Sequence, residues 1–108
     1  MHIEWSSEKD KKKVLQLAQQ NRVTARRMNA IKAAKNFYDI EHPSTGRAHF
    51  LKHDLAGHFA IDLESKTRPA RLICEPVGDC QQDERGFYIK ETITEFRVIK
   101  IEKDYHKK

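Results

Sequence analysis

The alternation of apolar and polar positions divides the chain into a helical first third and a strand-rich remainder. The opening His2-Ile3-Glu4-Trp5 alternates and predicts one short strand, with Trp5 as an anchor packed under the helices. Ser6 or Ser7 then offers an N-cap oxygen just before two acidic residues, which favour the positive end of a helix dipole. We therefore expect a helix that ends near Asn21. Its narrow apolar stripe has i, i+3, i+4 spacing: Val14, Leu17 and Ala18.

A second helix is expected over residues 24–36. Its apolar face is formed by Ala25, Met28, Ile31 and Ala34, with Phe37 just beyond. Basic side chains, including Arg26 and Arg27, lie largely off this face. With so short a connection, the two helices should form a hairpin.

Beyond residue 46 the periodicity changes to that of strands. Four segments are candidates: residues 48–52, 57–64, 70–75 and 93–102. In the last one, the Val98-Ile99 pair breaks strict alternation, which is the pattern of a strand buried on both faces. Residues 76–88 are rich in Asp, Gln and Gly and predict a long mobile loop.

This order of elements predicts an α+β fold, with a two-helix hairpin on one face of a mainly antiparallel sheet. With 108 residues, the chain should form one domain, residues 1–108. The other sheet face would be left open. We expect that face to be concave and ringed by scattered basic side chains, as in an RNA cradle.

The charge is uneven along the chain. The net charge is +5, yet residues 1–36 hold 9 Lys+Arg against 3 Asp+Glu, and the remaining residues hold 12 against 13. Basic charge attracts RNA, DNA or an acidic protein alike, so charge alone does not choose the partner. The run Lys11-Lys12-Lys13 is therefore either a solvated helix face or a contact surface for ribosomal RNA, together with Arg26 and Arg27.

The cysteines and the apolar segments suggest where the chain works. No apolar run approaches the roughly 20 residues that cross a bilayer, and the N-terminus lacks a signal-peptide core, so we expect a cytoplasmic protein. Cys74 and Cys80 lack the number and spacing of a zinc site and should be reduced thiols. No metal-binding motif or cofactor is expected.

Three stretches together resemble the HigB-like killer proteins of plasmid maintenance systems, within the RelE/ParE toxin superfamily. They are Ala30-Ile31-Lys32-Ala33-Ala34-Lys35-Asn36-Phe37-Tyr38-Asp39-Ile40, Ala48-His49-Phe50-Leu51-Lys52-His53-Asp54-Leu55-Ala56-Gly57 and Lys103-Asp104-Tyr105-His106. Each motif is short, but their order and spacing fit together. The resemblance covers roughly residues 22–75 and 93–106.

The resemblance implies a RelE-like fold and the toxin of a type II toxin–antitoxin system. Such a toxin is an endoribonuclease, or mRNA interferase, that cleaves mRNA, usually on the translating ribosome. Its partner is a cognate antitoxin of helix-turn-helix, HigA-like type. Residue by residue, His49 and Lys52 match the family's H-x-L-K element, Arg71 matches the arginine of a later strand, and the last match is the terminal Asp104-Tyr105-His106.

These residue types suit metal-independent RNA cleavage, in which the 2′-hydroxyl loses a proton, the leaving 5′-oxygen gains one and a charged phosphate is stabilised. His106 is the first choice for proton transfer, and His49 is the second. Lys52 and Arg71 could hold the phosphate, with Lys52 also a possible base. Tyr105 could stack on a base, and Asp104 could orient a neighbouring group.

Three departures from the family pattern leave alternatives open. His53 replaces the usual glycine after the lysine, Ala70 stands where an aromatic often precedes the arginine, and residues 76–92 form a longer insertion. One alternative is a non-enzymatic toxin of the ParE type that inhibits DNA gyrase. The other is a degenerate family member without activity.

Overall fold

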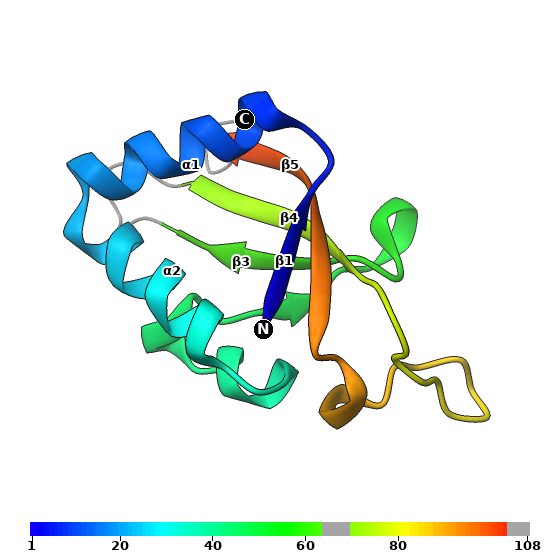
Figure 1. Ribbon diagram of the computed structural model, residues 1–108. Helices are drawn as coiled ribbons and strands as arrows, with labels where there is room; N and C mark the ends of the chain where they lie inside the picture. Colours follow the sequence, from blue (N-terminus) through cyan, green and yellow to red (C-terminus); the bar gives the residue numbers. More distant parts are fainter. Residues whose placement is uncertain (64–69, 104–108) are drawn as a thin grey trace.

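The computed structural model describes residues 1–63 and 70–103 and shows an α+β fold (Figure 1). The helices are α1 (Glu8–Gln20) and α2 (Arg22–Ala33). The strands are β1 (His2–Trp5), β2 (His49–Phe50), β3 (Phe59–Asp62), β4 (Ala70–Pro76) and β5 (Glu95–Lys103). The sheet order is β1-β5-β4-β3-β2, with β1 parallel to β5 and every other neighbouring pair antiparallel. The α+β class and the mainly antiparallel sheet are confirmed.

Side-chain caps explain where the helices begin and end. The Ser7 hydroxyl accepts a hydrogen bond from the Asp10 N–H at 3.3 Å, as an N-cap should. Asn21 ends α1 and also caps α2, since its side chain accepts from the Thr24 N–H at 3.1 Å. One residue thus separates the helices, and α2 begins at Arg22, two residues before the predicted start. It also ends three residues before the predicted position 36, because Ala34 is already extended.

Both helices cover one face of the sheet (Figure 1), and the core lies between the two layers. Val14, Met28 and Ile31 reach down from the helices. They meet the alternate side chains of the three central strands, namely Phe59, Ile61, Leu72, Cys74, Phe96 and Val98. Trp5 is half-buried against this core, as predicted. The alternate residues of these strands lie on the opposite face, here called the open face because neither α1 nor α2 covers it (Figure 1); Ala60 and Ile73 on that face are nonetheless buried.

The Val98-Ile99 pair marks a β-bulge. Cys74 pairs with Val98, whereas the preceding Ile73 pairs with Lys100, so Ile99 is an extra residue on β5. A bulge changes which residues alternate without requiring burial on both faces. The prediction that this pair marks a strand buried on both faces is therefore wrong for β5, where Ile99 is half-buried and Lys100 is exposed.

Residues 76–88, predicted as a long mobile loop, begin with the last residue of β4 and are otherwise a connection with one internal bridge. Gln82 and Tyr88 make an isolated antiparallel bridge. At the tip, the Asp83 carboxylate accepts hydrogen bonds from the backbone N–H groups of Arg85 at 2.9 Å and Phe87 at 3.0 Å.

Among the described residues, no helix is long and apolar enough to cross a membrane.

Candidate functional site

The candidate site residues fall partly inside the described structure. His49 lies on β2, Lys52 directly follows that strand, and Arg71 lies on β4. Asp104, Tyr105 and His106 lie outside the described residues. The geometry of the site can therefore be built from His49, Lys52 and Arg71.

His49 and Arg71 face the same way. In the strand register His49 pairs with Ala60, and Arg71 pairs with Asp62. Side chains of directly paired residues share a face, as do residues two apart on one strand. On β3, Phe59 points into the core, so Ala60 and Asp62, one and three residues later, point to the open face. Their partners His49 and Arg71 therefore lie on the open face as well. They lie two strands apart, with β3 between them, and two residues apart along the strands, or about 12 Å at 4.8 Å per strand and 3.3 Å per residue.

Lys52 lies at the other end of β3. The Leu51 N–H donates to the His58 carbonyl at 2.9 Å, which puts Lys52 beyond the start of β3, while Arg71 pairs with its last residue, Asp62. His58 and Asp62 are four residue steps apart, or about 13 Å at 3.3 Å per step. The fold therefore brings His49 to the face of Arg71 but does not bring Lys52 beside it.

The backbone at His53 bears on one departure from the family pattern, in which histidine replaces the usual glycine after Lys52. His53 has φ +62°, in the left-handed region where a side chain other than glycine is strained. This backbone conformation gives a physical reason for a glycine at this position. Lys52 itself is exposed at the start of a 3₁₀ turn, His53–Leu55.

Arg71 is held by a carboxylate. Its Nε donates to Glu102 Oε1 at 2.7 Å, and Lys100 Nζ lies 3.6 Å from the other oxygen of Glu102. Burial disfavours the charged form of Glu102, but the hydrogen bond and charge of Arg71, helped by Lys100, outweigh it and lower the pKa of Glu102. The ion pair therefore orients the Arg71 guanidinium at the open face.

A second ionic row crosses the sheet from β3 to β1. Glu75 accepts from Arg97 at 3.1 Å, and Arg97 also donates to Glu4 at 3.1 Å. His58 Nε2 lies 3.8 Å from Glu75, while its buried Nδ1 has no hydrogen-bond partner within the part of the chain that the structure describes. In register these residues form one line, because Glu75 pairs with Arg97 and Arg97 with Glu4.

The open face is not strongly basic. Among the described side chains of the five strands, 3 Lys and Arg stand against 5 Asp and Glu. His49 is half-buried, with Nδ1 2.9 Å from the Arg47 carbonyl. The described strands thus carry oriented ion pairs on this face, and the expected ring of basic side chains around it stays a prediction.

The basic surface lies on the helices, which carry 8 Lys and Arg against 2 Asp and Glu. Of the predicted RNA contacts, Lys11, Lys12 and Arg26 are exposed, and Lys13 is half-buried. Arg27 differs, since its guanidinium donates to the Asp62 carbonyl at 3.0 Å and joins α2 to the end of β3. The structure thus gives Arg27 a structural contact that its sequence position did not reveal.

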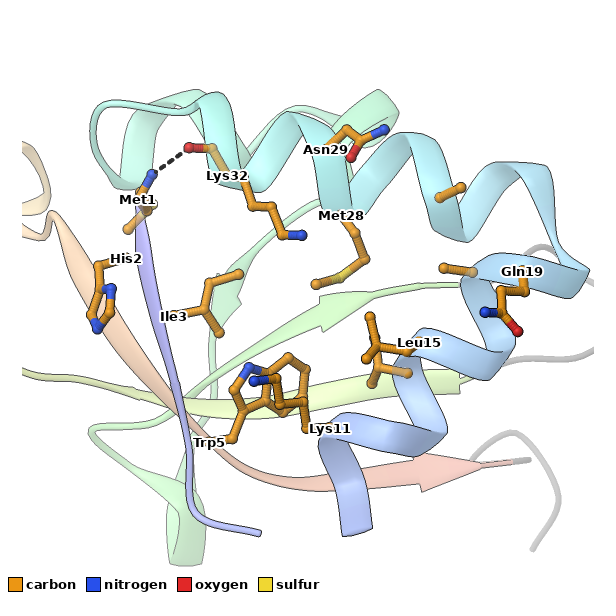
Figure 2. Close-up of a pocket in the computed structure, with 13 residues that line it drawn as sticks. Met1, His2, Ile3, Trp5, Lys11, Leu15, Gln19, Met28, Asn29 and Lys32 are labelled. Carbon is orange, nitrogen blue, oxygen red and sulfur yellow. Dashed lines mark hydrogen bonds between the residues drawn. The ribbon is translucent and has the colours of Figure 1, made fainter. Parts of the chain in front are cut away.

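A groove of about 650 Å³ opens between β1 and the two helices (Figure 2). Ile3, Trp5, Leu15 and Met28 form much of its wall, and Lys11 and Lys32 also line it. Leu15 is 50% exposed. The sequence contained a signal for this groove. Leu15 is apolar but lies outside the i, i+3, i+4 stripe of α1 that is expected to face the core, so it was left to form another apolar surface.

The described residues also hold a cluster that the sequence analysis missed. One ligand atom from each of His2, Glu4 and Glu95 lies within 4.8 Å of the other two. The signal was the His-x-Glu alternation, which puts both side chains on one face of β1. These three residues could hold a metal ion, although Glu4 is already paired with Arg97.

Both cysteines are free, as predicted. Burial raises the pKa of the Cys74 thiol well above its ordinary value, and burial is also the main reason that the pKa of Cys80 is raised. Protonated thiols are poor nucleophiles. Burial thus disfavours the reactive thiolate form of both side chains.

Comparison of this chain with protein-family models, with curated proteins and with solved structures finds no match.

Proposed function

We propose that this chain is a RelE/HigB-type toxin that cleaves mRNA at the open face of its sheet. The observation that carries the proposal is the register that puts His49 and Arg71 on the sheet face opposite the helices. Both residues belong to the motifs that resemble the toxin family. The left-handed backbone at His53 adds support, because the resemblance expects glycine there.

In the proposed reaction the 2′-hydroxyl attacks the adjacent phosphorus, and the bond to the 5′-oxygen breaks. A base takes the 2′-hydroxyl proton, and an acid protonates the leaving 5′-oxygen, which yields a cyclic phosphate and a free 5′-hydroxyl. His106 and His49 are the proposed proton carriers, with Asp104 as an orienting group. Arg71 stabilises the phosphate charge, and its pairing with Glu102 holds it in place before the substrate binds.

Lys52 has a different proposed role from Arg71. Since the two lie at opposite ends of β3, they do not contact the same phosphate oxygens in this arrangement. Lys52 instead holds a neighbouring phosphate of the RNA as a point charge. Tyr105 remains the proposed stacking partner for a base next to the cleaved bond.

The helical layer suits the expected partners. The exposed cations of the helices would attract ribosomal RNA, and the apolar groove beside Leu15 and Trp5 suits a segment of the cognate antitoxin. Docking there would leave the open face uncovered. Antitoxin binding would then act by blocking ribosome access.

One observation favours the non-enzymatic alternative. The described open face has more acids than cations, which is unusual for a surface that binds RNA. A ParE-type toxin that inhibits gyrase through protein contacts does not need a basic face.

The experiment that decides is expression of the chain in cells, with primer extension on a translated message and measurement of plasmid supercoiling. The proposed nuclease cuts the message and leaves supercoiling normal. Normal messages with altered supercoiling would support the gyrase alternative. Neither effect, from a chain that is folded by circular dichroism, would indicate a member without activity.

A further inference from the structure

A column of stacked aromatic rings runs from the core towards the surface near Lys52. Phe37 and Phe50 stack with ring centroids 4.8 Å apart and planes at 21°. Phe50 and Tyr88 stack in turn at 5.7 Å and 12°. Phe37 is fully buried, whereas Phe50 and Tyr88 are half-buried. The column therefore ends at the surface with planar rings.

A pocket of about 430 Å³ lies at this end, between residues 50–57 and residues 82–90. Its lining consists of Phe50, Leu51, Ala56, Gly57, Gln82, Gly86, Phe87, Tyr88 and Lys90. The lining thus combines three aromatic rings, one amide and one ammonium group, with no acidic side chain. Rings that stack, an amide that hydrogen-bonds and a cation are the groups that recognise an unpaired nucleobase.

Phe87 is 66% exposed, and the local structure keeps it so. The Asp83 carboxylate accepts from its backbone N–H, and Gly86 takes the left-handed conformation that the turn needs, with φ +83°. A single exposed apolar residue needs no explanation by itself. Here, however, a built turn holds the ring at the mouth of an aromatic pocket.

Cations lie around the pocket. Exposed Lys52 follows Leu51 of the lining, and Lys90 is oriented by Glu41, whose carboxylate lies 2.5 Å from its Nζ. The insertion that distinguishes this chain from the shorter members of the resembled family supplies Gln82, Phe87, Tyr88 and Lys90. The pocket is therefore made largely by the inserted turn.

We propose that this pocket binds an unpaired base of single-stranded RNA, with Phe87 and Tyr88 as the stacking surfaces and Gln82 as the hydrogen-bonding group. The adjacent Lys52 holds the backbone phosphate. This inference rests on the proposed function in so far as RNA is the ligand. It adds a base-binding site at the end of β3 that is remote from Arg71.

The test measures binding of a labelled single-stranded oligoribonucleotide by fluorescence anisotropy, alongside an abasic ribose-phosphate chain of the same length. Phe87→Ala should weaken binding of the oligoribonucleotide about tenfold, the usual size of one lost stacking contact. Phe87→Tyr, which keeps the ring, should bind like the wild type. Gln16→Ala is the control, because it shortens an exposed side chain of α1 that lines neither this pocket nor the groove beside the helices. Circular dichroism confirms that each variant is folded.

Two results would overturn the inference: equal binding of the abasic chain and the oligoribonucleotide by the wild type, or unchanged binding by Phe87→Ala. Loss of antitoxin binding in Phe87→Ala, with RNA binding intact, would likewise assign the pocket to a protein partner. Base-dependent binding by a wild-type chain that does not cut messages would support the pocket and remove the nuclease proposal. If Phe87→Ala still cuts messages and still binds RNA like the wild type, the nuclease proposal would be supported and the pocket proposal would fail.

Discussion

The helical layer and the open sheet face differ in how they carry charge. The helices hold 8 Lys and Arg against 2 acids, and many of these cations are exposed. The described side chains of the strands include 3 Lys and Arg against 5 acids, and these cations lie in ion pairs such as Glu75–Arg97–Glu4. The basic excess of the chain is therefore not on the face that holds His49 and Arg71.

Because of this difference, the cations of the helices and those of the sheet face should have different roles. Exposed cations attract a polyanion from a distance, and salt screens that attraction. Paired cations attract weakly, but their partners fix where each guanidinium points. We infer that the helices bring the chain to its target and that the sheet face positions the reacting phosphate. Five predictions follow from this division, from the largest expected effect to the smallest.

The sharpest test compares two paired arginines on the open face. Arg71→Ala should lower message cleavage about 100- to 1000-fold, because it removes a charge that stabilises the transition state. Arg97→Ala removes an equally paired arginine that no family motif marks, so its cleavage rate should change little. Rates come from primer extension with purified variants of confirmed fold. Equal losses in both variants would show that Arg71 acts only through its ion pair.

The groove on the helical side should control antitoxin binding. Leu15→Asp introduces a charge into the apolar wall and should weaken the complex by about 2 kcal/mol, or roughly thirtyfold. Gln16→Asp adds the same charge to the neighbouring exposed position, which does not line the groove, and should have little effect. Titration calorimetry with the purified antitoxin measures both. Equal weakening by the two variants would indicate a general charge effect rather than a docking groove.

The exposed lysines of α1 should act through salt-dependent attraction. Lys11→Ala with Lys12→Ala should weaken ribosome binding about tenfold at low salt and reduce the slope of log K against log salt by up to about 2. Cleavage of a bound message should be unchanged. Ribosome co-sedimentation over a salt series provides the measurement. A defect that persists at high salt would argue for a specific contact.

The strained residue on the sheet side should be replaceable with a gain in stability. His53→Gly relieves a left-handed backbone at φ +62° and should raise the free energy of unfolding by about 1 kcal/mol. Asp54→Gly, one residue later and outside the left-handed region, should not stabilise the chain. Urea denaturation of the two variants gives the comparison. A destabilised His53→Gly variant would mean that the imidazole makes a stabilising contact.

The smallest expected effect is the acid dependence of the Arg71–Glu102 pair. Because the pKa of Glu102 is lowered in the folded chain, the pair stabilises the fold above the ordinary carboxyl pKa of about 4.3. That contribution is lost as the pH falls through the lowered pKa. The stability difference between wild type and Glu102→Gln should therefore shrink on acidification. Urea midpoints measured over an acid series provide the check, and a constant difference would exclude titration of Glu102 as the cause.

The sequence by itself determined the elements and their class. Ser7 and Asn21 cap helices through hydrogen bonds to residues three positions away, so their effect is local and can be read directly. The apolar and polar pattern likewise predicted strands at the positions of β3, β4 and β5, although the bulge in β5 was read wrongly. Such signals depend on residues within a few positions along the chain, so they can be recognised without knowledge of the fold.

Only the tertiary structure decided the arrangement of the candidate site. The bulge at Ile99, the left-handed backbone at His53 and the distance between Lys52 and Arg71 all depend on which strands pair and in which register. The ion pairs that neutralise the open face join residues far apart in sequence, such as Glu4 and Arg97. Net charge counts these residues without regard to their neighbours. The sequence thus placed the basic excess in residues 1–36, the helical third, whereas only the structure showed that charges of the sheet face are paired across strands.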